Sequence, residues 1–140
     1  MTDATTSANS TMAIAASALQ AQQSRMRVIA ENIANADSTS ATAGGDPYRR
    51  QAPVFEPRMV AGGATGVVFK GAQPDQSAFR SEYSPGNPAA DAKGYVKMPN
   101  VDPLIEALDM REAQRAYEAN LNVIETARTM QSRTLDLLKP

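Results

Sequence analysis

The chain has 140 residues, of which 42% are hydrophobic and 21% are charged, and its formal net charge is −1. This balance is ordinary for one folded domain, and a net charge so near zero supplies no general field for nucleic acid or an anionic membrane. The absence of Cys and His excludes disulfides, thiolate nucleophiles and zinc–thiolate sites, and it removes the side chain best suited to proton transfer near neutral pH.

A helix is predicted for residues 10–36, after a flexible N-terminal tail at residues 1–9. The apolar residues of a seven-residue repeat in this segment are Met12, Leu19, Met26 and Ile33. Such spacing is typical of helices that pair as a coiled coil. Ser10 or Thr11 is the expected N-cap, and we expect the helix to end near Asp37, where short polar side chains compete for backbone hydrogen bonds.

The central segment, residues 37–100, is predicted to be a loop followed by a small β-rich insert. All eight Gly lie between Gly44 and Gly94, and glycine at this density favours turns and strands over helices. The candidate strands, each bounded by Gly or Pro, are residues 52–56, 65–70, 77–83 and 94–98. An insert this small buries little apolar area by itself, so its stability should depend on its neighbours.

A second helix is predicted for residues 101–140. Asp102 is the expected N-cap and Pro103 the first helical residue, because the missing N–H of proline costs nothing there. The apolar stripe of this helix consists of Leu104, Leu108, Met110, Ala113, Tyr117, Leu121, Ile124, Ala127, Met130, Leu135 and Leu138. Several of these, such as Met110 and Leu121, are eleven residues apart, which favours a nearly straight or right-handed seam.

Together these segments predict an α+β protein in which long N- and C-terminal helices form a coiled-coil-like pair around a small β-rich central insert. The helices would be about 40 and about 50 Å long at 1.5 Å per residue, whereas a typical globular helix has only about 11 to 12 residues. We expect them to pack on each other, either parallel or antiparallel. Such a pair leaves each helix half exposed, and leftover apolar surface usually marks an interaction site.

No motif in the sequence predicts catalysis. The stretch GGATGVVFKG lacks the Gly-Lys-Ser/Thr of a phosphate loop, and Asp75, Asp91 and Asp102 lie in loops without a convergent His. In GGDPYRR the aspartate and the two arginines could bind an anion, although a turn followed by arginines on a strand face or an interface is the simpler interpretation. We therefore predict no catalytic residue, no cofactor and no metal site.

Four asparagines occupy helical positions where a charged residue would be the ordinary surface choice: Asn32, Asn35, Asn120 and Asn122. An amide donates and accepts hydrogen bonds at once. At a helix–helix seam an asparagine costs stability but fixes register and partner choice. The alternative for Asn35 is that it only terminates its helix.

Targeting signals are not evident. The segment MTDATTSANSTMAIAASALQ has no positively charged region, which argues against a cleaved secretory signal. The apolar runs are only a few residues long, so no segment is expected to span a bilayer. Taken alone, these features favour a cytoplasmic location.

Both ends of the chain carry a motif of the same protein family. SALQAQQSRMRVIAENIANADST contains Ile-Ala-x-Asn-Ile-Ala-Asn, and EAQRAYEANLNVIETARTMQSRTLDLL contains Glu-Ala-x-Arg-Ala-Tyr-Glu-Ala-Asn. Both resemble the terminal helices of the bacterial flagellar axial proteins, the rod and hook family. DPYRRQAPVFE, GYVKMPNVDP and the short insert narrow the resemblance to proximal-rod members, and the likeness covers residues 15–139.

The resemblance implies a structural subunit of the flagellar rod, the drive shaft that crosses the periplasm, and not an enzyme. It implies export through the flagellar type III apparatus, whose substrates keep their N-terminus, and this reconciles a periplasmic location with the missing signal. The implied partners are that apparatus, other rod proteins and further copies of the chain in a helical assembly, without nucleic acid or membrane insertion.

In such an assembly the terminal helices would become fully ordered mainly on joining the rod. The residues expected at the subunit interface are Leu19, Met26, Ile29, Asn32, Ile33, Asn35, Leu108, Met110, Tyr117, Asn120, Leu121, Ile124 and Leu135. The alternative is a cytoplasmic coiled-coil adaptor or secretion chaperone that uses the same stripes on one partner. An adaptor should form a discrete folded oligomer alone, whereas a rod subunit should be monomeric with mobile ends.

Overall fold

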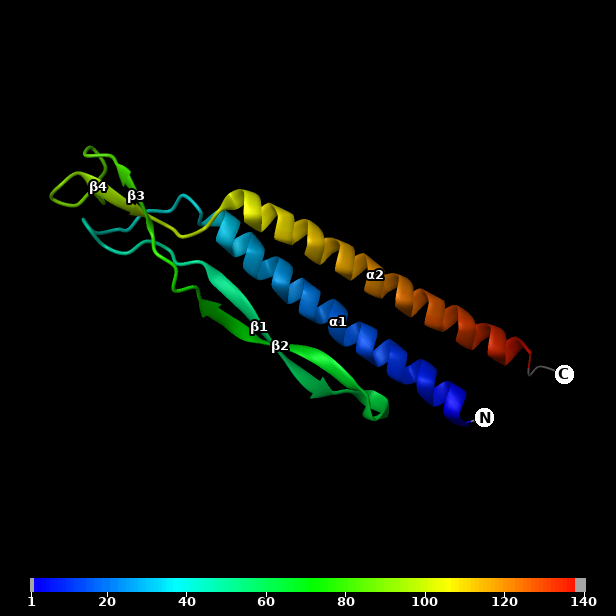
Figure 1. Cartoon of the computed structure of the whole chain (residues 1–140). Helices are drawn as coiled ribbons and strands as arrows, with labels where there is room; N and C mark the ends of the chain where they lie inside the picture. The colour runs from blue at the N-terminus through cyan, green and yellow to red at the C-terminus, as the bar shows by residue number, and fades with distance from the viewer. Residues whose placement is uncertain (1, 138–140) are drawn as a thin grey trace. The chain divides into compact units, whose positions relative to one another are not determined.

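The computed structural model describes residues 2–137 and contains two long helices and two small sheets (Figure 1). The helices are α1 (Thr2–Ala34) and α2 (Pro103–Asp136). The strands are β1 (Gln51–Met59), β2 (Thr65–Pro74), β3 (Arg80–Tyr83) and β4 (Tyr95–Met98), with a 3-10 turn, η1, at Ala61–Gly63. The predicted α+β class and all four predicted strands are confirmed, with shifted boundaries.

The chain divides into two compact units, and both helices contribute to both units. The first unit comprises the described residues up to Met26, Val54–Gly71, and the described residues from Glu112 onward. The second comprises Arg27–Pro53 and Ala72–Arg111. The units are described separately below.

In the first unit α1 and α2 pack antiparallel. Gln23 Nε2 donates to the Tyr117 hydroxyl at 3.4 Å, and Arg25 lies 3.6 Å from the Glu112 carboxylate. These contacts confirm the predicted helix pair. Among the residues of this unit whose burial is described, the buried apolar side chains are all alanines: Ala15, Ala21, Ala113 and Ala127.

The buried line of α1 differs from the predicted heptad. Met12, Leu19 and Met26 are only half-buried and Ile33 is exposed. The buried apolar positions of α1 and the turn that follows it are instead Ala15, Ala21, Val28, Ile29 and Ala36. The four large apolar residues of the predicted heptad are therefore not the most buried positions of α1.

The two helix starts give opposite outcomes. The Asp102 carboxylate accepts from the backbone N–H of Leu104 at 2.9 Å, which confirms the predicted cap of α2. The α1 helix already begins at Thr2, within the segment predicted as a flexible tail, so the predicted caps were wrong. The Ser10 and Thr11 hydroxyls each donate to the Ser7 carbonyl at 2.9 Å, as hydroxyls do inside a continuous helix.

Some predictions about the chain ends stay untested. The mobility of residues 1–9 in the free protein remains a prediction. The last residue of the predicted α2 stripe, Leu138, lies outside the described residues. The predicted end of the first helix, in contrast, is tested: α1 ends at Ala34, slightly before the predicted boundary at residue 36.

A β-hairpin packs on α1 in the first unit. β1 and β2 are hydrogen-bonded neighbours, and the short η1 connection requires them to be antiparallel. The Val67 N–H donates to the Ser17 hydroxyl at 3.1 Å, and Ser17 donates onward to the Ile14 carbonyl at 2.7 Å. Gly66 leaves no room for a side chain, since an added Cβ would collide with the Ser17 hydroxyl and lie 2.8 Å from Val60.

We therefore expect Gly66→Ala to loosen the hairpin from α1. Overpacking at such a contact typically costs about 1 to 3 kcal/mol, and the Val67 amide should lose hydrogen-exchange protection. Gly86→Ala is the matched control, because an added Cβ at Gly86 meets no atom within 4 Å. Equal exchange protection of Val67 in the two variants would contradict this contact.

In the second unit β3 and β4 pair antiparallel, with Arg80 opposite Met98 and Tyr83 opposite Tyr95. The two tyrosine rings meet edge to face with centroids 5.3 Å apart. The most buried apolar side chains of this unit are Val28, Ile29, Ala36, Ala89, Val96 and Val101. They come from α1, the loops and β4, so this unit has a small apolar core of its own.

Candidate assembly interface and its polar anchor

Asn32, near the end of α1, is buried, and its side-chain amide binds two other segments of the chain. Its Nδ2 donates to the Gln51 carbonyl at 2.8 Å and to Glu106 Oε2 at 3.1 Å. Its Oδ1 accepts from the Tyr48 hydroxyl at 2.8 Å and from the Gln51 N–H at 2.9 Å. One amide thus uses both donors and both acceptor positions, and it ties the start of β1 and the first turn of α2 to α1.

The same cluster holds a buried ion pair. Glu106 is fully buried, and its Oε1 accepts from Arg50 Nε at 2.5 Å. The Arg50 guanidinium also lies 3.5 Å from Asp75 and 3.8 Å from Asp109. Burial alone would lower the pKa of Arg50, but the three carboxylates, Glu106 first, outweigh burial and raise that pKa.

Residues outside the helices add further hydrogen bonds to the cluster. Asn100 Oδ1 accepts from the Arg50 N–H at 2.8 Å, and Asn100 Nδ2 donates to the Ser77 hydroxyl at 2.8 Å. Arg49 Nη1 donates to the Asp75 carbonyl at 2.9 Å, and its guanidinium lies 4.1 Å from the centre of the Phe79 ring. Backbone and hydroxyl donors from Ser77 to the Asp75 carboxylate hold the pKa of Asp75 below its usual range. We name the cluster of Asn32, Tyr48, Arg50, Gln51, Asp75, Asn100 and Glu106 the polar anchor.

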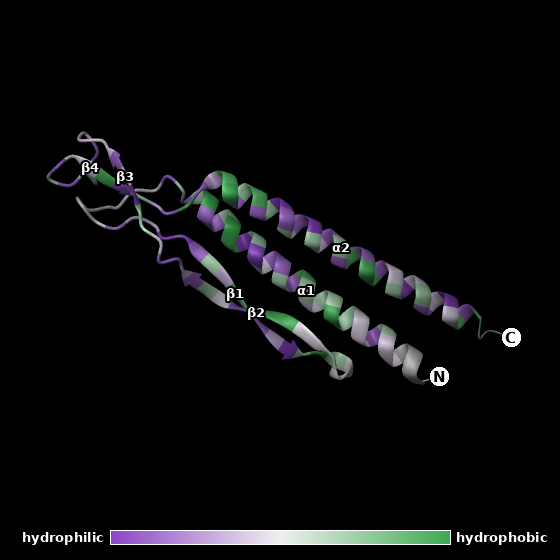
Figure 2. Ribbon diagram, viewed as in Figure 1, coloured by the Kyte–Doolittle hydropathy of each residue, from purple (hydrophilic) through white to green (hydrophobic). Residues whose placement is uncertain are grey.

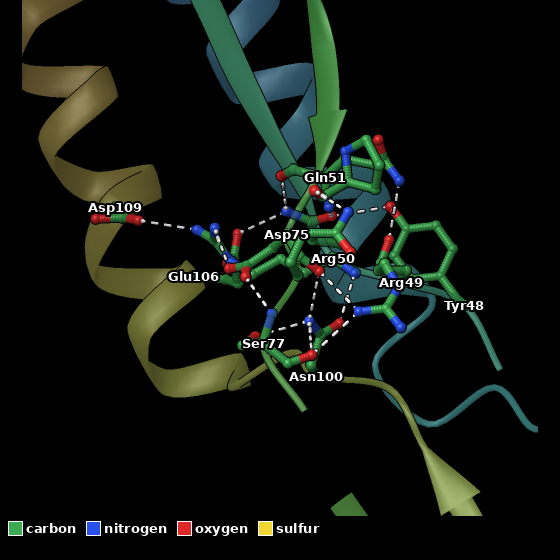
Figure 3. Close-up of polar contacts among 12 residues, drawn as sticks. Tyr48, Arg49, Arg50, Gln51, Asp75, Ser77, Asn100, Glu106 and Asp109 are labelled. Carbon is green, nitrogen blue, oxygen red and sulfur yellow. Dashed lines mark hydrogen bonds and ion pairs between the residues drawn. The ribbon is translucent and has the colours of Figure 1, made fainter. Parts of the chain in front are cut away.

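The polar anchor has a structural role, because it holds several segments of the chain together. Its donors and acceptors satisfy one another across α1, β1, the segment after β2 and α2, as Figure 3 shows for the labelled side chains. A buried carboxylate is tolerable only when paired and hydrogen-bonded, and here it is both. The anchor therefore ties α1 to α2 within the second unit.

The sequence predicted part of this cluster. Asn32 was expected to lie at a helix–helix seam, and the structure places it there, in contact with Glu106; its role in fixing the register stays a prediction. Arg49 and Arg50 bind groups of their own chain, and both lie just before β1 and not on a strand face, where the simpler interpretation of GGDPYRR had placed them. Asp46 pairs instead with Lys97 at 2.7 Å, and that hydrogen bond lowers the pKa of Asp46.

Glu106 was missed. On the sequence it is one of several acidic residues of α2, and its spacing from the Asp102 cap is that of an ordinary first-turn carboxylate. Its partner Arg50 lies on the other side of the insert. Only the closure of the insert brings them together, so no local signal could have found the pair.

Apolar side chains are also left exposed on the helices. In Figure 2 hydrophobic positions recur along α2 and are not confined to one segment. The exposed large hydrophobic residues of α2 and its C-terminal end are Leu104, Ile105, Leu108, Leu121, Val123, Met130, Leu135 and Leu137. In the first unit an open groove between the helices is lined by Thr11, Asn122, Val123, Thr126, Ala127 and Met130. Such surface on a helix usually contacts another chain.

The interface residues predicted for α1 fall into three classes. Ile29 and Asn32 are buried inside the chain, so neither offers free surface. Leu19, Met26 and Asn35 are half-buried, and Ile33 is exposed. Asn35 Nδ2 donates to the Glu31 carbonyl at 2.9 Å, as expected of a residue that terminates its helix.

The residues predicted for α2 fall into two classes. The half-buried ones are Met110, Tyr117, Asn120 and Ile124, and the exposed ones are Leu108, Leu121 and Leu135. Asn120 Nδ2 donates to the Ala116 carbonyl at 2.8 Å within its own helix. An interface role for these residues stays a prediction, and the exposed ones are best placed for it.

Comparison with known proteins assigns the family. Residues 12–41 match the model "Flagella basal body rod protein", and residues 92–137 match "Flagellar basal body rod FlgEFG protein C-terminal". The flagellar basal-body rod protein FlgC of Agrobacterium fabrum is 51% identical over 127 residues, covering 90% of this chain and 91% of that protein. The chain belongs to the FlgC family of flagellar basal-body rod proteins.

Other FlgC relatives give the same result. The protein of Escherichia coli O6:H1 is 46% identical, covering 89% of this chain and 92% of its own length. The FlgC protein of Bacillus subtilis is 36% identical, covering 90% of this chain and 95% of its own length. As a FlgC-family member the chain is a non-enzymatic structural subunit of the basal-body rod and assembles with other rod subunits.

Within residues 2–137 no helix has both the length and the apolar character needed to cross a bilayer.

Proposed function

We propose that the chain is a building block of the proximal-rod drive shaft, which transmits torque from the motor to the hook. The proposal rests on one observation: α2 keeps exposed large hydrophobic residues, including Leu104, Leu108 and Met130, although it already packs on α1. Neighbouring axial subunits would cover these residues by helix–helix packing. Burying a Leu or Met side chain contributes about 1.5 to 3 kcal/mol, so many such contacts would make the shaft stiff.

We further propose that the subunit leaves the cytoplasm through the flagellar type III export apparatus without a cleaved signal. An exported chain travels largely unfolded and completes its folding on arrival. Leu19, Met26 and Ile124 are only half-buried in the single chain. This is the pattern expected if neighbouring subunits cover the remaining surface of the helix pair. Assembly partners would include further copies of the chain as well as other rod proteins.

Leu121→Asp tests the packing proposal. Leu121 is 38% exposed, so an aspartate there would place a charge in an intersubunit contact. We expect export of the variant at the normal level, no completed rods in isolated basal bodies and loss of swimming. Ser132→Asp, at an exposed polar position of the same helix, is the matched control and should swim normally.

Circular dichroism of the purified variant separates a folding defect from an assembly defect. Helix content equal to the unsubstituted chain, together with absent rods, supports the proposal. Normal motility of Leu121→Asp would contradict it.

A further inference from the structure

The contacts of the polar anchor close loops of very different length. Asn32 and Gln51 are 19 residues apart in the sequence. Arg50 and Glu106 are 56 residues apart, and Asn32 and Glu106 are 74 apart. Closing a short loop costs less conformational entropy than closing a long one, and contacts between near neighbours in the sequence form faster. The contact of α1 with the start of β1 is therefore the part of the anchor that can form most readily.

This contact is nearly complete without α2. Asn32 Nδ2 donates to the Gln51 carbonyl, and Asn32 Oδ1 accepts from the Gln51 N–H and the Tyr48 hydroxyl. Three of the four hydrogen bonds of the Asn32 amide thus lie within residues 32–51, and only the bond to Glu106 reaches α2. The Arg50 side chain is 23% exposed, so its charge can remain hydrated until Glu106 arrives.

The reverse order is unfavourable. The Glu106 side chain is 1% exposed, and a buried carboxylate is tolerated only when it is paired and hydrogen-bonded. Its Oε2 accepts from Asn32 on α1, and its Oε1 accepts from Arg50, next to the start of β1. If α2 docked on α1 before β1 was in place, Glu106 would be buried without Arg50. The two halves of the anchor are therefore not equivalent, because one is satisfied alone and the other is not.

We propose that the polar anchor sets the order of folding in the second unit. The contact of α1 with the start of β1 forms first, and the first turn of α2 docks last, on the site prepared by Asn32 and Arg50. Pairing of the two terminal helices in this unit therefore waits until the central insert has begun to fold. The order is a property of the single chain and is independent of the rod function proposed above.

Two adjacent backbone amides report the two events separately. The Gln51 N–H donates to Asn32 Oδ1 at 2.9 Å, so it reports the contact with α1. The Arg50 N–H donates to Asn100 Oδ1 at 2.8 Å across 50 residues, and Asn100 lies just before the Asp102 cap of α2. The Arg50 amide therefore reports the arrival of the segment that carries the start of α2.

Pulse-labelling hydrogen exchange during refolding of the purified, unsubstituted chain tests the order. We expect the Gln51 amide to gain protection at least about threefold faster than the Arg50 amide, because the nearer contact forms first. Protection of both amides at the same time, or of the Arg50 amide first, overturns the proposal.

Two conservative variants provide a second measurement. Tyr48→Phe removes a hydroxyl that donates within the early contact, and Glu106→Gln removes the charge that docks late. Interactions made early in folding affect the refolding rate, whereas interactions made late affect the unfolding rate. We expect Tyr48→Phe to slow refolding at least about threefold, and Glu106→Gln to speed unfolding at least about tenfold while its refolding rate stays within about twofold.

Tyr83→Phe is the matched control for the lost hydroxyl. Tyr83 lies on β3 in the same unit and is 64% exposed, so neither rate should change by more than about twofold. The deciding quantity is the share of each stability change that appears in the refolding rate. A share for Glu106→Gln that equals or exceeds the share for Tyr48→Phe overturns the proposed order.

Discussion

Arg50→Met is expected to lower the free energy of unfolding by about 3 kcal/mol. The Glu106 side chain is 1% exposed and Arg50 is its ion-pair partner. Removing one member of a buried pair leaves an uncompensated charge, at a cost of about 3 to 5 kcal/mol. Arg50 is itself 23% exposed, so water can enter beside it, and the lower end of this range applies.

Urea denaturation of the purified chain measures this loss. Combining Arg50→Met with Glu106→Gln removes the buried charge while keeping an oxygen that can accept from Asn32 Nδ2. We expect the double variant to recover at least about 1 kcal/mol relative to Arg50→Met alone. Strictly additive losses in this double-mutant cycle, or a loss below about 1 kcal/mol for Arg50→Met, would show that the buried pair is not what holds the segments together.

Local patterns in the sequence were sufficient to predict the strands and the start of α2. The strands were predicted because Gly and Pro bound short apolar runs, and the start of α2 was predicted because Asp102 precedes Pro103. Both signals act over a few residues, and the structure confirms both. The start of α1 was misplaced, since Ser10 and Thr11 look like caps until a helix continues through them.

Long-range pairing could not be derived in the same way. Heptad reasoning favours large apolar residues at buried positions, whereas the buried apolar side chains among the described residues of the first unit are Ala15, Ala21, Ala113 and Ala127. Alanine carries a weak periodic signal, because it is also the best helix former on a solvated face. The seam was therefore assigned to neighbouring Met and Leu positions that the structure leaves half-buried.

In the polar anchor, too, contacts between residues far apart in the sequence could not be predicted. Asn32 stood out because an amide is unusual on a helix surface, and its role at a seam followed. The roles of Tyr48, Gln51 and Glu106 depend on where the insert returns to the helices, and this is set by the closed fold. The predicted subunit-interface residues are tested neither by the elements nor by the polar anchor. A single chain shows which surface is exposed, but it does not specify which neighbour covers that surface.

Asn32→Asp is the sharpest test of the anchor, because aspartate has nearly the same shape as asparagine. The substitution replaces the Nδ2 donor by an oxygen that would face the Gln51 carbonyl at 2.8 Å and Glu106 Oε2 at 3.1 Å. Both contacts would change from attractive to repulsive, and a second buried carboxylate would lie beside the first. An unpaired buried charge costs about 3 to 5 kcal/mol, so we expect a loss of at least about 3 kcal/mol at neutral pH.

Asn35→Asp is the matched control, one helical turn away. Asn35 is half-buried and its amide donates only to the Glu31 carbonyl of its own helix. An aspartate there meets the negative end of the helix dipole, which costs about 0.3 to 1 kcal/mol. Thermal and urea unfolding of both variants should therefore differ by about 2 kcal/mol or more. Equal losses would mean that Asn32 terminates its helix as Asn35 does, and that the register of α1 against α2 is set by the apolar seam alone.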